Sequence, residues 1–260
     1  NGCTASTTIT VTEPAALSIS VSTTDATCAG ANNGTAVAFV TGGTAGYSYL
    51  WSNALTSNPI TNLAPGNITL IVTDANGCTS NANGVINEPA PITATVQITD
   101  VTCNGLSDGI IDVTVAGGTP GYSFIWDDPA SSTTEDINTL AQGTYNLIIT
   151  DANGCTASTS ATVNEPNPLV VSSTITSPIL VNGGQGIISV SAVGGVAPYN
   201  GTGTFNEFSG TYTYIVTDAN GCTSSTTITI TEPNALQASA TISSIIPCNG
   251  GNGIIDVTAT

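Results

Sequence analysis

The chain has 260 residues and carries 17 acidic side chains but no Lys, Arg or His, which gives a formal net charge of −17. Without these residues it has no imidazole base, no Schiff-base amine and no histidine metal ligand. It also has no cationic side chain with which to bind nucleic acid or an anionic membrane surface. We therefore expect no enzymatic activity, no nucleic-acid binding and no membrane insertion.

Each structural unit is predicted to consist of short strands joined by turns. At the start of the first unit Leu17, Ile19 and Val21 alternate with polar residues, which indicates a half-buried strand. Gly-rich turns lead to further strands, one of which ends at Trp51. The last two strands flank an Asp-Ala-Asn-Gly turn at residues 74–77, which is typical of a hairpin.

One motif recurs along the whole chain. Residues 72–79 read VTDANGCT, close matches stand at residues 149–156 and 216–223, and residues 1–4 match the end of the motif. A Glu-Pro pair follows each copy at constant spacing. The pairs are Glu13 and Pro14, Glu88 and Pro89, Glu165 and Pro166, and Glu232 and Pro233. Such repetition predicts a tandem array of similar units, and we interpret the pairs as short, stiff linkers.

The fold class follows from the spacing of the strands and turns. Short strands separated by turn signals at regular intervals are typical of an all-β sandwich. We predict tandem immunoglobulin-like β-sandwich repeats in an elongated array. The predicted domains are 1–14, the last strand of a preceding repeat; 15–89 and 90–166, two full repeats; 167–233, a shortened repeat; and 234–260, the first part of a further repeat.

The motifs resemble the SprB repeat. The shared elements are a Gly-Gly…Gly-Tyr-x-Tyr/Phe-x-Trp sequence that ends at Trp51 and Trp126, the Val-Thr-Asp-x-x-Gly-Cys-Thr hairpin, and the Glu-Pro pair. The SprB repeat is a PKD-like, immunoglobulin-like module of surface adhesins in gliding Bacteroidota, which are exported by the type IX secretion system. The resemblance implies an extracellular, cell-surface protein that acts in adhesion or gliding motility.

Seven cysteines in a repeated, secreted pattern favour disulfides over a metal site. Three pairing schemes are open. A within-copy scheme joins Cys28 to Cys78 and Cys103 to Cys155. A linker scheme joins Cys3 to Cys28, Cys78 to Cys103 and Cys222 to Cys248. A cross-copy scheme joins Cys28 to Cys155 and Cys103 to Cys222.

The predicted strand order favours the cross-copy scheme. In a sandwich of this type, the loop with Cys28 lies at the pole where the chain leaves, and the hairpin with Cys78 lies at the opposite pole. The poles are about 30 Å apart, whereas the Cα atoms of a disulfide lie within about 7 Å. We therefore predict the bridges Cys28–Cys155 and Cys103–Cys222, with Cys3, Cys78 and Cys248 pairing outside residues 1–260. Val181 replaces the cysteine in the third copy.

Two other groups of residues are weaker candidates for a site. Asp74, Asp151 and Asp218 are weak candidates for calcium ligands, although a hairpin turn accounts for the same residues and we favour it. No cofactor is expected apart from weakly bound calcium. Aromatic residues such as Trp51 and Trp126 could stack on sugars, but their recurrence at one strand position favours packing.

The leading functional hypothesis is a structural repeat region of a secreted cell-surface adhesin or extracellular filament. It would form a stiff stalk that resists proteases, since the chain has no Lys or Arg for a trypsin-like enzyme. Its expected partners are neighbouring repeats of the same chain and other copies of the filament. The alternative hypothesis is that the repeats themselves bind polysaccharide or a cell-surface partner.

Overall fold

The computed structural model describes residues 2–260, and Asn1, which we assigned to the end of a preceding motif, lies outside the described residues. Every regular element within residues 2–260 is a β-strand. No helix in this range is long and apolar enough to cross a membrane.

The chain divides into two compact units. The first contains the residues up to Gln97 together with Asp112–Ile137 and Tyr145–Ala161, and the second contains Ile98–Ile111, Asn138–Thr144 and Thr162–Thr260. The predicted repeat 90–166 thus contributes strands to both units. The predicted domain boundaries remain predictions.

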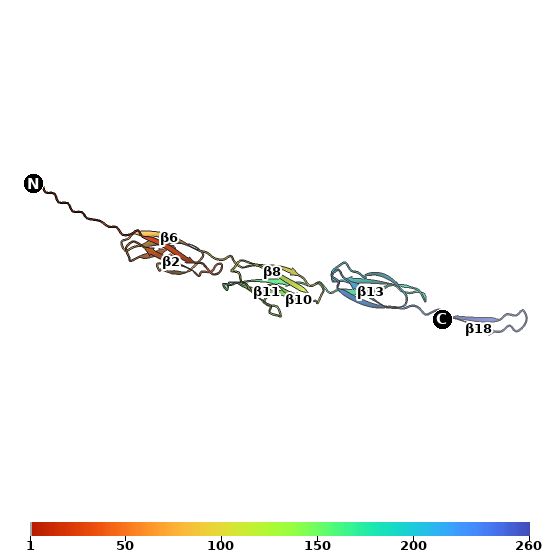
Figure 1. Ribbon diagram of the computed structural model, residues 1–260. Coiled ribbons are helices and arrows are strands. Elements are labelled where there is room, and N and C mark those ends of the chain that lie inside the picture. The colour runs from red at the N-terminus through yellow and green to blue at the C-terminus, as the bar shows by residue number, and fades with distance from the viewer. Residues whose placement is uncertain (1) are drawn as a thin grey trace. The chain divides into compact units, whose positions relative to one another are not determined.

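The first copy of the repeat is a sandwich of two antiparallel sheets (Figure 1). Its strands are β1 (Ser18–Thr24), β2 (Gly34–Thr41), β3 (Ser48–Trp51), β4 (Ile60–Leu63), β5 (Gly66–Thr73) and β6 (Thr79–Ile86). One sheet has the order β1-β2-β4 and the other has the order β3-β5-β6. A hydrogen bond of 2.7 Å from Thr23 Oγ1 to Val85 O joins β1 to β6 and so connects the two sheets.

The core of this sandwich forms because alternate residues of each strand point inward. In β5, Ile68, Leu70 and Val72 are buried, while the residues between them face outward. Trp51 is 1% exposed, and its ring nitrogen donates a 2.9 Å hydrogen bond to Ser57 O. The indole ring therefore belongs to the core.

The same order of strands recurs in the second copy. Its strands are β7 (Thr93–Thr99), β8 (Gly109–Ala116), β9 (Ser123–Trp126), β10 (Ile137–Leu140), β11 (Gly143–Thr150) and β12 (Thr156–Val163). The sheet orders are β7-β8-β10 and β9-β11-β12. Trp126 is buried, and its ring nitrogen donates to Thr134 O at 3.0 Å, as Trp51 does to Ser57 O.

The third copy is trimmed. Its strands are β13 (Val170–Ser177), β14 (Gly186–Val193), β15 (Gly203–Glu207), β16 (Gly210–Thr217) and β17 (Thr223–Ile230). β16 and β17 form a two-stranded sheet, and an isolated bridge between Asn200 and Thr217 stands where β3 and β9 stand in the other copies. Without the Trp, Phe205 and Tyr214 pack with ring centroids 4.6 Å apart.

The last elements, β18 (Ala238–Ser244) and β19 (Ile254–Ala259), form a single antiparallel hairpin. It corresponds to the β1–β2 hairpin of the first copy. Taken together, the paired sheets confirm the predicted fold class of tandem immunoglobulin-like β-sandwich repeats.

Candidate functional site

The hairpin that carries each motif cysteine is built around a buried aspartate. Asp74, Asp151 and Asp218 are 5 to 6% exposed. In each, Oδ1 accepts backbone N–H groups from the residues two and four positions later; for Asp151 these are Asn153 at 2.9 Å and Cys155 at 2.8 Å. The equivalent donors are Asn76 and Cys78, and Asn220 and Cys222. The aspartate therefore fixes the backbone that presents the cysteine.

The second carboxylate oxygen fastens the hairpin to the Gly-Gly turn that follows the second strand of the copy. Oδ2 of Asp151 accepts the N–H of Thr119 at 2.8 Å, and Asp74 and Asp218 accept those of Thr44 and Val196 at 2.9 Å. These contacts explain the three aspartates as hairpin braces, the interpretation that we favoured. No group of three or more His, Cys, Asp or Glu side chains suited to a metal ion occurs within residues 2–260, and calcium binding stays a prediction.

These hydrogen bonds set the acid–base behaviour of the aspartates. The N–H groups of Thr44 and Cys78 hold the pKa of Asp74 below its usual value, and that of Thr119 does so for Asp151. Burial raises the pKa of Asp218, but the N–H groups of Val196 and Cys222 outweigh it and the net shift is downward. The charged form is favoured because backbone donors stabilise a carboxylate.

We expect the chain to lose stability in acid because of these aspartates. Since their pKa is lower in the folded than in the unfolded chain, the unfolded chain binds protons first as the pH falls. The stabilisation is complete above the unfolded pKa of about 3.9 and is lost as the pH falls through the lower folded value. Urea unfolding between about pH 5 and about pH 2 should show a steep decline.

The variant Asp151→Asn tests this expectation, since it removes one titrating group. Its stability should be lower than that of the native chain near neutral pH, and its decline in acid should be shallower. Asp112→Asn, on the exposed side of β8, is the matched control and should keep the native slope. An unchanged slope in Asp151→Asn would contradict the role given to this carboxylate.

The other cysteine of the first and second copies lies in a loop after the first strand, and the glutamate of the Glu-Pro pair holds this loop in place. Gly105 N donates to Glu165 Oε2 at 2.7 Å, and Asn104 Nδ2 donates to Glu165 Oε1 at 2.8 Å. Glu88 and Glu232 accept the N–H groups of Gly30 and Gly183 in the same way. The glutamate is therefore a brace for the cysteine loop as well as part of the connection between copies.

The sequence interpretation missed this role of the glutamate, because it explained the pair through proline alone. The sequence does carry a signal for this role. The residue before the proline is glutamate in every copy, although proline restricts only the backbone of that residue and does not require an acid. A second signal was the glycine two residues after Cys28 and Cys103.

The structure brings the two kinds of cysteine together. Cys28 is bonded to Cys155 with Cα atoms 5.6 Å apart, and Cys103 is bonded to Cys222 with Cα atoms 5.7 Å apart. These are the pairs of the cross-copy scheme. Each bridge connects the loop after the first strand of one copy to the hairpin of the next copy, and each lies within one compact unit.

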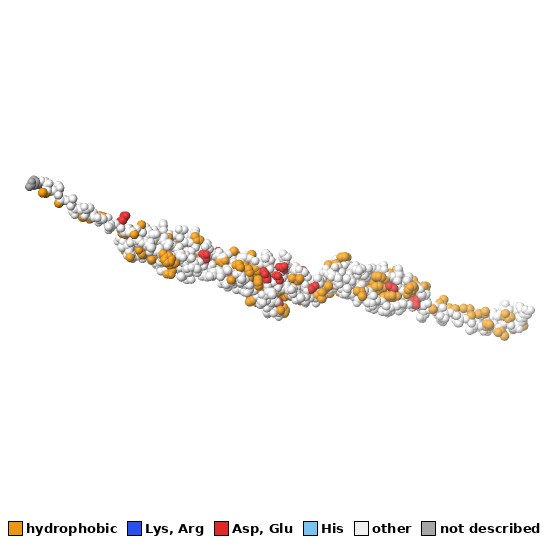
Figure 2. Space-filling view, viewed as in Figure 1, with side chains coloured by type: hydrophobic (Ala, Val, Ile, Leu, Met, Phe, Trp, Pro, Cys, Tyr) orange, Lys and Arg blue, Asp and Glu red, His pale blue; other side chains and the backbone are white. Residues whose placement is uncertain are grey.

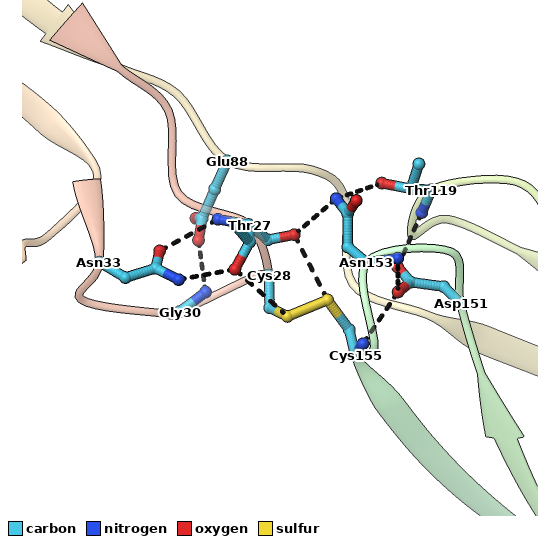
Figure 3. The surroundings of a disulfide bond; sticks show 9 residues. All are labelled: Thr27, Cys28, Gly30, Asn33, Glu88, Thr119, Asp151, Asn153 and Cys155. Carbon is cyan, nitrogen blue, oxygen red and sulfur yellow. Dashed lines mark hydrogen bonds between the residues drawn. A yellow bond between two sulfur atoms is a disulfide. The ribbon is translucent and has the colours of Figure 1, made fainter. Parts of the chain in front are cut away.

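An asparagine side chain lies beside each bridge and spans the same two segments. Figure 3 shows Asn153 beside the bridge Cys28–Cys155. Asn153 Nδ2 donates to Thr27 O at 3.1 Å and to Thr119 Oγ1 at 2.9 Å. Asn220 Nδ2 donates to Thr102 O at 2.9 Å. Cys155 Sγ lies 3.3 Å from Thr27 O. This is a contact and not a hydrogen bond, because a sulfur in a disulfide carries no proton. The bridge, the asparagine and the glutamate together define the junction site.

A family comparison matches two segments that each contain one side of this site. The model of the SprB repeat matches residues 20–56 and 95–131. This match confirms the SprB resemblance. Both matched segments contain the loop cysteine, the Gly-Gly turn and the buried Trp. The matches cover less than half of the chain, and a search of curated proteins found no match.

Solved structures of low sequence identity also resemble this chain. Titin domains I67–I69, in an E-to-A variant, are 13% identical with a TM-score of 0.36; the match covers 78% of this chain and 94% of that one. A tetra-tandem repeat from the extending region of a large adhesion protein is 13% identical with a TM-score of 0.27, over 94% and 88% of the two chains. The eight N-terminal Ig domains of Down Syndrome Cell Adhesion Molecule are 10% identical with a TM-score of 0.28, over 88% and 49%.

The aromatic residues of the two matched segments pack into the fold. Trp51 and Trp126 are buried, as we favoured over a sugar-stacking surface. The hydroxyl of Tyr47 donates to Gly42 O at 2.6 Å, and that of Tyr122 donates to Gly117 O. Both tyrosines thus hold the Gly-Gly turn that receives the buried aspartate.

Three cysteines remain free within residues 2–260. Cys3, Cys78 and Cys248 are exposed thiols. Val181, which replaces the loop cysteine of the third copy, is 66% exposed beside the exposed Leu180. This loop keeps the glutamate brace from Glu232 although it lacks a cysteine.

Proposed function

We propose that the chain is a structural repeat region of a secreted cell-surface adhesin or extracellular filament, in which it forms a stiff, protease-resistant stalk. The observation that carries this proposal is the bridging of successive copies, since the two disulfides join residues 127 and 119 positions apart. A disulfide within one copy would stabilise that copy alone. A disulfide between copies also limits their relative movement.

The contacts around the bridge support the same conclusion. The loop that carries Cys28 is held by Glu88, and the chain then passes from Pro89 to Ile92 beside the hairpin that carries Cys155. The two copies are thus joined at the junction in two ways, by the linker and by the disulfide, and Glu88 holds the loop that carries the disulfide. Bending at the linker would have to break the Asn153 hydrogen bond or deform the bridge.

The surface composition suits an exposed extracellular filament. The only charged side chains of the sequence are acidic. On the visible face they are scattered between uncharged and hydrophobic surface (Figure 2). Like charges of this kind keep neighbouring filaments apart. Disulfides persist in oxidising compartments outside the cell. Neighbouring repeats of the same chain are the partners that the junction contacts support.

The stalk can be tested by small-angle X-ray scattering of a variant with Cys3, Cys78 and Cys248 replaced by serine. Both bridges remain in this variant. We expect reductant to broaden the distribution of interatomic distances at unchanged secondary structure, because the junctions become free to bend. A distribution that reductant leaves unchanged would contradict a stiffening role for the bridges.

The alternative, that the repeats bind polysaccharide or a cell-surface partner, has one observation in its favour. Phe39 and Phe208 are more than half exposed, although the two tryptophans are buried. Titration of the same variant with acidic and neutral polysaccharides would detect such binding. Saturable binding that Phe39→Ala abolishes would favour the alternative.

A further inference from the structure

We propose that the Asn-Gly pairs at residues 104–105 and 182–183 are sites of spontaneous deamidation, which the linker glutamates keep unreactive. When the contact with the glutamate is lost, the asparagine is converted to aspartate or isoaspartate. This inference concerns the chemical lifetime of the loops after the first strand of each copy, and it does not depend on the proposed stalk function.

The two pairs lie in equivalent loops of the second and third copies. Asparagine is a chemically labile residue, and it is most labile before glycine, which has no side chain to obstruct its own backbone nitrogen. The first copy has Ala29 in place of the asparagine. The four residues of the two pairs are exposed, so water reaches them and burial does not protect them.

Deamidation begins when the backbone nitrogen of Gly105 loses its proton and attacks Cγ of Asn104. A bond forms between this nitrogen and Cγ and closes a succinimide ring, while the bond from Cγ to Nδ2 breaks and Nδ2 leaves with the proton as ammonia. Water then opens the ring. Attack of water on Cγ gives aspartate, and attack on the main-chain carbonyl carbon gives isoaspartate. The sum is one water consumed and one ammonia released, with no oxidant.

One carboxylate holds both groups that this reaction uses. Glu165 Oε2 accepts the N–H of Gly105 at 2.7 Å, and Glu165 Oε1 accepts a hydrogen bond from Asn104 Nδ2 at 2.8 Å. Asn104 Nδ2 also donates to Pro166 O at 3.2 Å. The attacking nitrogen and the leaving amide group are therefore both bound to the start of the linker.

The contact with the carboxylate opposes both chemical steps. The nitrogen of Gly105 must give up the proton that it donates to Glu165, and it must carry a negative charge beside a carboxylate. A hydrogen bond to the protonated form and a nearby negative charge both disfavour the loss of a proton. Departure of Asn104 Nδ2 as ammonia also breaks its two hydrogen bonds. The glutamate therefore slows deamidation.

The third copy has the same arrangement in part, although it has no disulfide at this loop. Gly183 N donates to Glu232 Oε2, and Asn182 Nδ2 donates to Pro233 O at 3.1 Å. Val181 stands in place of the bridging cysteine. The contacts that hold the pair thus come from the Glu-Pro segment and do not require the bridge.

The Asn-Gly pairs of the hairpins are held by uncharged groups instead. Gly154 N donates to the backbone carbonyl of Asp151 at 3.0 Å, and Asn153 Nδ2 donates to a carbonyl and a hydroxyl oxygen. The rate of deamidation at Asn153 should therefore not depend on Glu165, which makes this residue an internal reference.

The product of the reaction cannot restore the original contacts. Aspartate at position 104 would place a carboxylate where Nδ2 now donates to Glu165, and the two negative charges would repel each other. Isoaspartate would also lengthen the main chain before Gly105, within the turn in which Leu106 N donates to Cys103 O at 3.1 Å. Deamidation would therefore release the loop that carries the bridging cysteine.

The test compares the chain with its Glu165→Gln variant, both with Cys3, Cys78 and Cys248 replaced by serine, during incubation at mildly alkaline pH. Glutamine keeps the size of the side chain but loses the charge and one acceptor. Samples are cleaved at acidic residues, and mass spectrometry measures the deamidated fraction of each asparagine over time.

We expect deamidation of Asn104 to become about tenfold faster in Glu165→Gln, as for the loss of a hydrogen bond to a charged group. The rate at Asn153 in the same samples should not change. Glu135→Gln, at an exposed position of another loop, is the matched control and should keep the parent rate at Asn104. An unchanged or slower rate at Asn104 in Glu165→Gln would overturn the proposal. Equal acceleration at Asn153 would also overturn it, because it would indicate a general loosening of the copy.

The first copy allows the converse experiment, because it has the glutamate contact without the asparagine. Ala29→Asn introduces an Asn-Gly pair into the loop in which Gly30 N donates to Glu88. The new asparagine should deamidate as slowly as Asn104 does in the parent chain. Addition of Glu88→Gln should accelerate it about tenfold, and equal rates with and without Glu88→Gln would contradict a protective role of the glutamate.

Discussion

Under force, a chain with both bridges extends to about half the length of the same chain without them. A fully extended chain of 260 residues spans roughly 900 Å. The bridges Cys28–Cys155 and Cys103–Cys222 enclose overlapping loops. Between Cys28 and Cys222 the shortest covalent path crosses the first bridge, runs back from Cys155 to Cys103 and then crosses the second bridge. The oxidised chain is therefore expected to extend to roughly 420 Å even after every sandwich has unfolded.

Because the two loops overlap, removing the bridges one at a time should change the extended length unequally. Loss of one bridge alone should lengthen the chain only slightly, because the remaining bridge still encloses 119 or 127 positions. Loss of both should restore the full length. Single-molecule force spectroscopy with handles at the two ends would measure these lengths in the Cys3, Cys78 and Cys248 serine background. Full extension of the oxidised chain would contradict the connectivity.

Much of this architecture can be predicted from the sequence because equivalent positions can be compared between several copies of one unit. The strand order follows from alternation around Ile19 and from the turn at residues 74–77. Opposite poles then exclude a Cys28–Cys78 bridge on distance alone. No side-chain detail is needed for this exclusion, because the distance depends only on which end of a strand each cysteine occupies.

The contacts that surround the bridges could not be predicted in the same way. The hydrogen bond from Asn153 to Thr27 O joins residues 126 positions apart and ends on a backbone carbonyl, which leaves no trace in the residue at position 27. The brace from Glu165 to Gly105 ends on a backbone N–H group. A hydrogen bond between a side chain and a backbone group requires a particular residue type at only one of its two partners. The periodicity of the sequence therefore does not reveal which residues are paired.

The second large effect is expected at a glycine where the linker meets the sandwich. Gly117 has φ of 78°, and a Cβ atom there would lie 2.0 Å from Pro91 O. Gly154 has a similar φ of 82°, but a Cβ atom there would have nothing within 4 Å. The pair therefore separates backbone strain, which both substitutions share, from a collision with the linker, which only Gly117→Ala introduces.

Gly154→Ala should destabilise the second copy by about 1 kcal/mol, the ordinary cost of alanine at positive φ. Gly117→Ala should cost about 3 kcal/mol or more, because the linker must move away and the 2.7 Å hydrogen bond from Gly118 N to Ala90 O is strained or lost. Urea unfolding followed by Trp126 fluorescence in a Trp51→Phe background would measure both values. Equal destabilisation would mean that the linker adjusts freely, and it would then contribute little to the rigidity of the junction. A large difference would show that the path from Pro89 to Ile92 is held firmly against the sandwich.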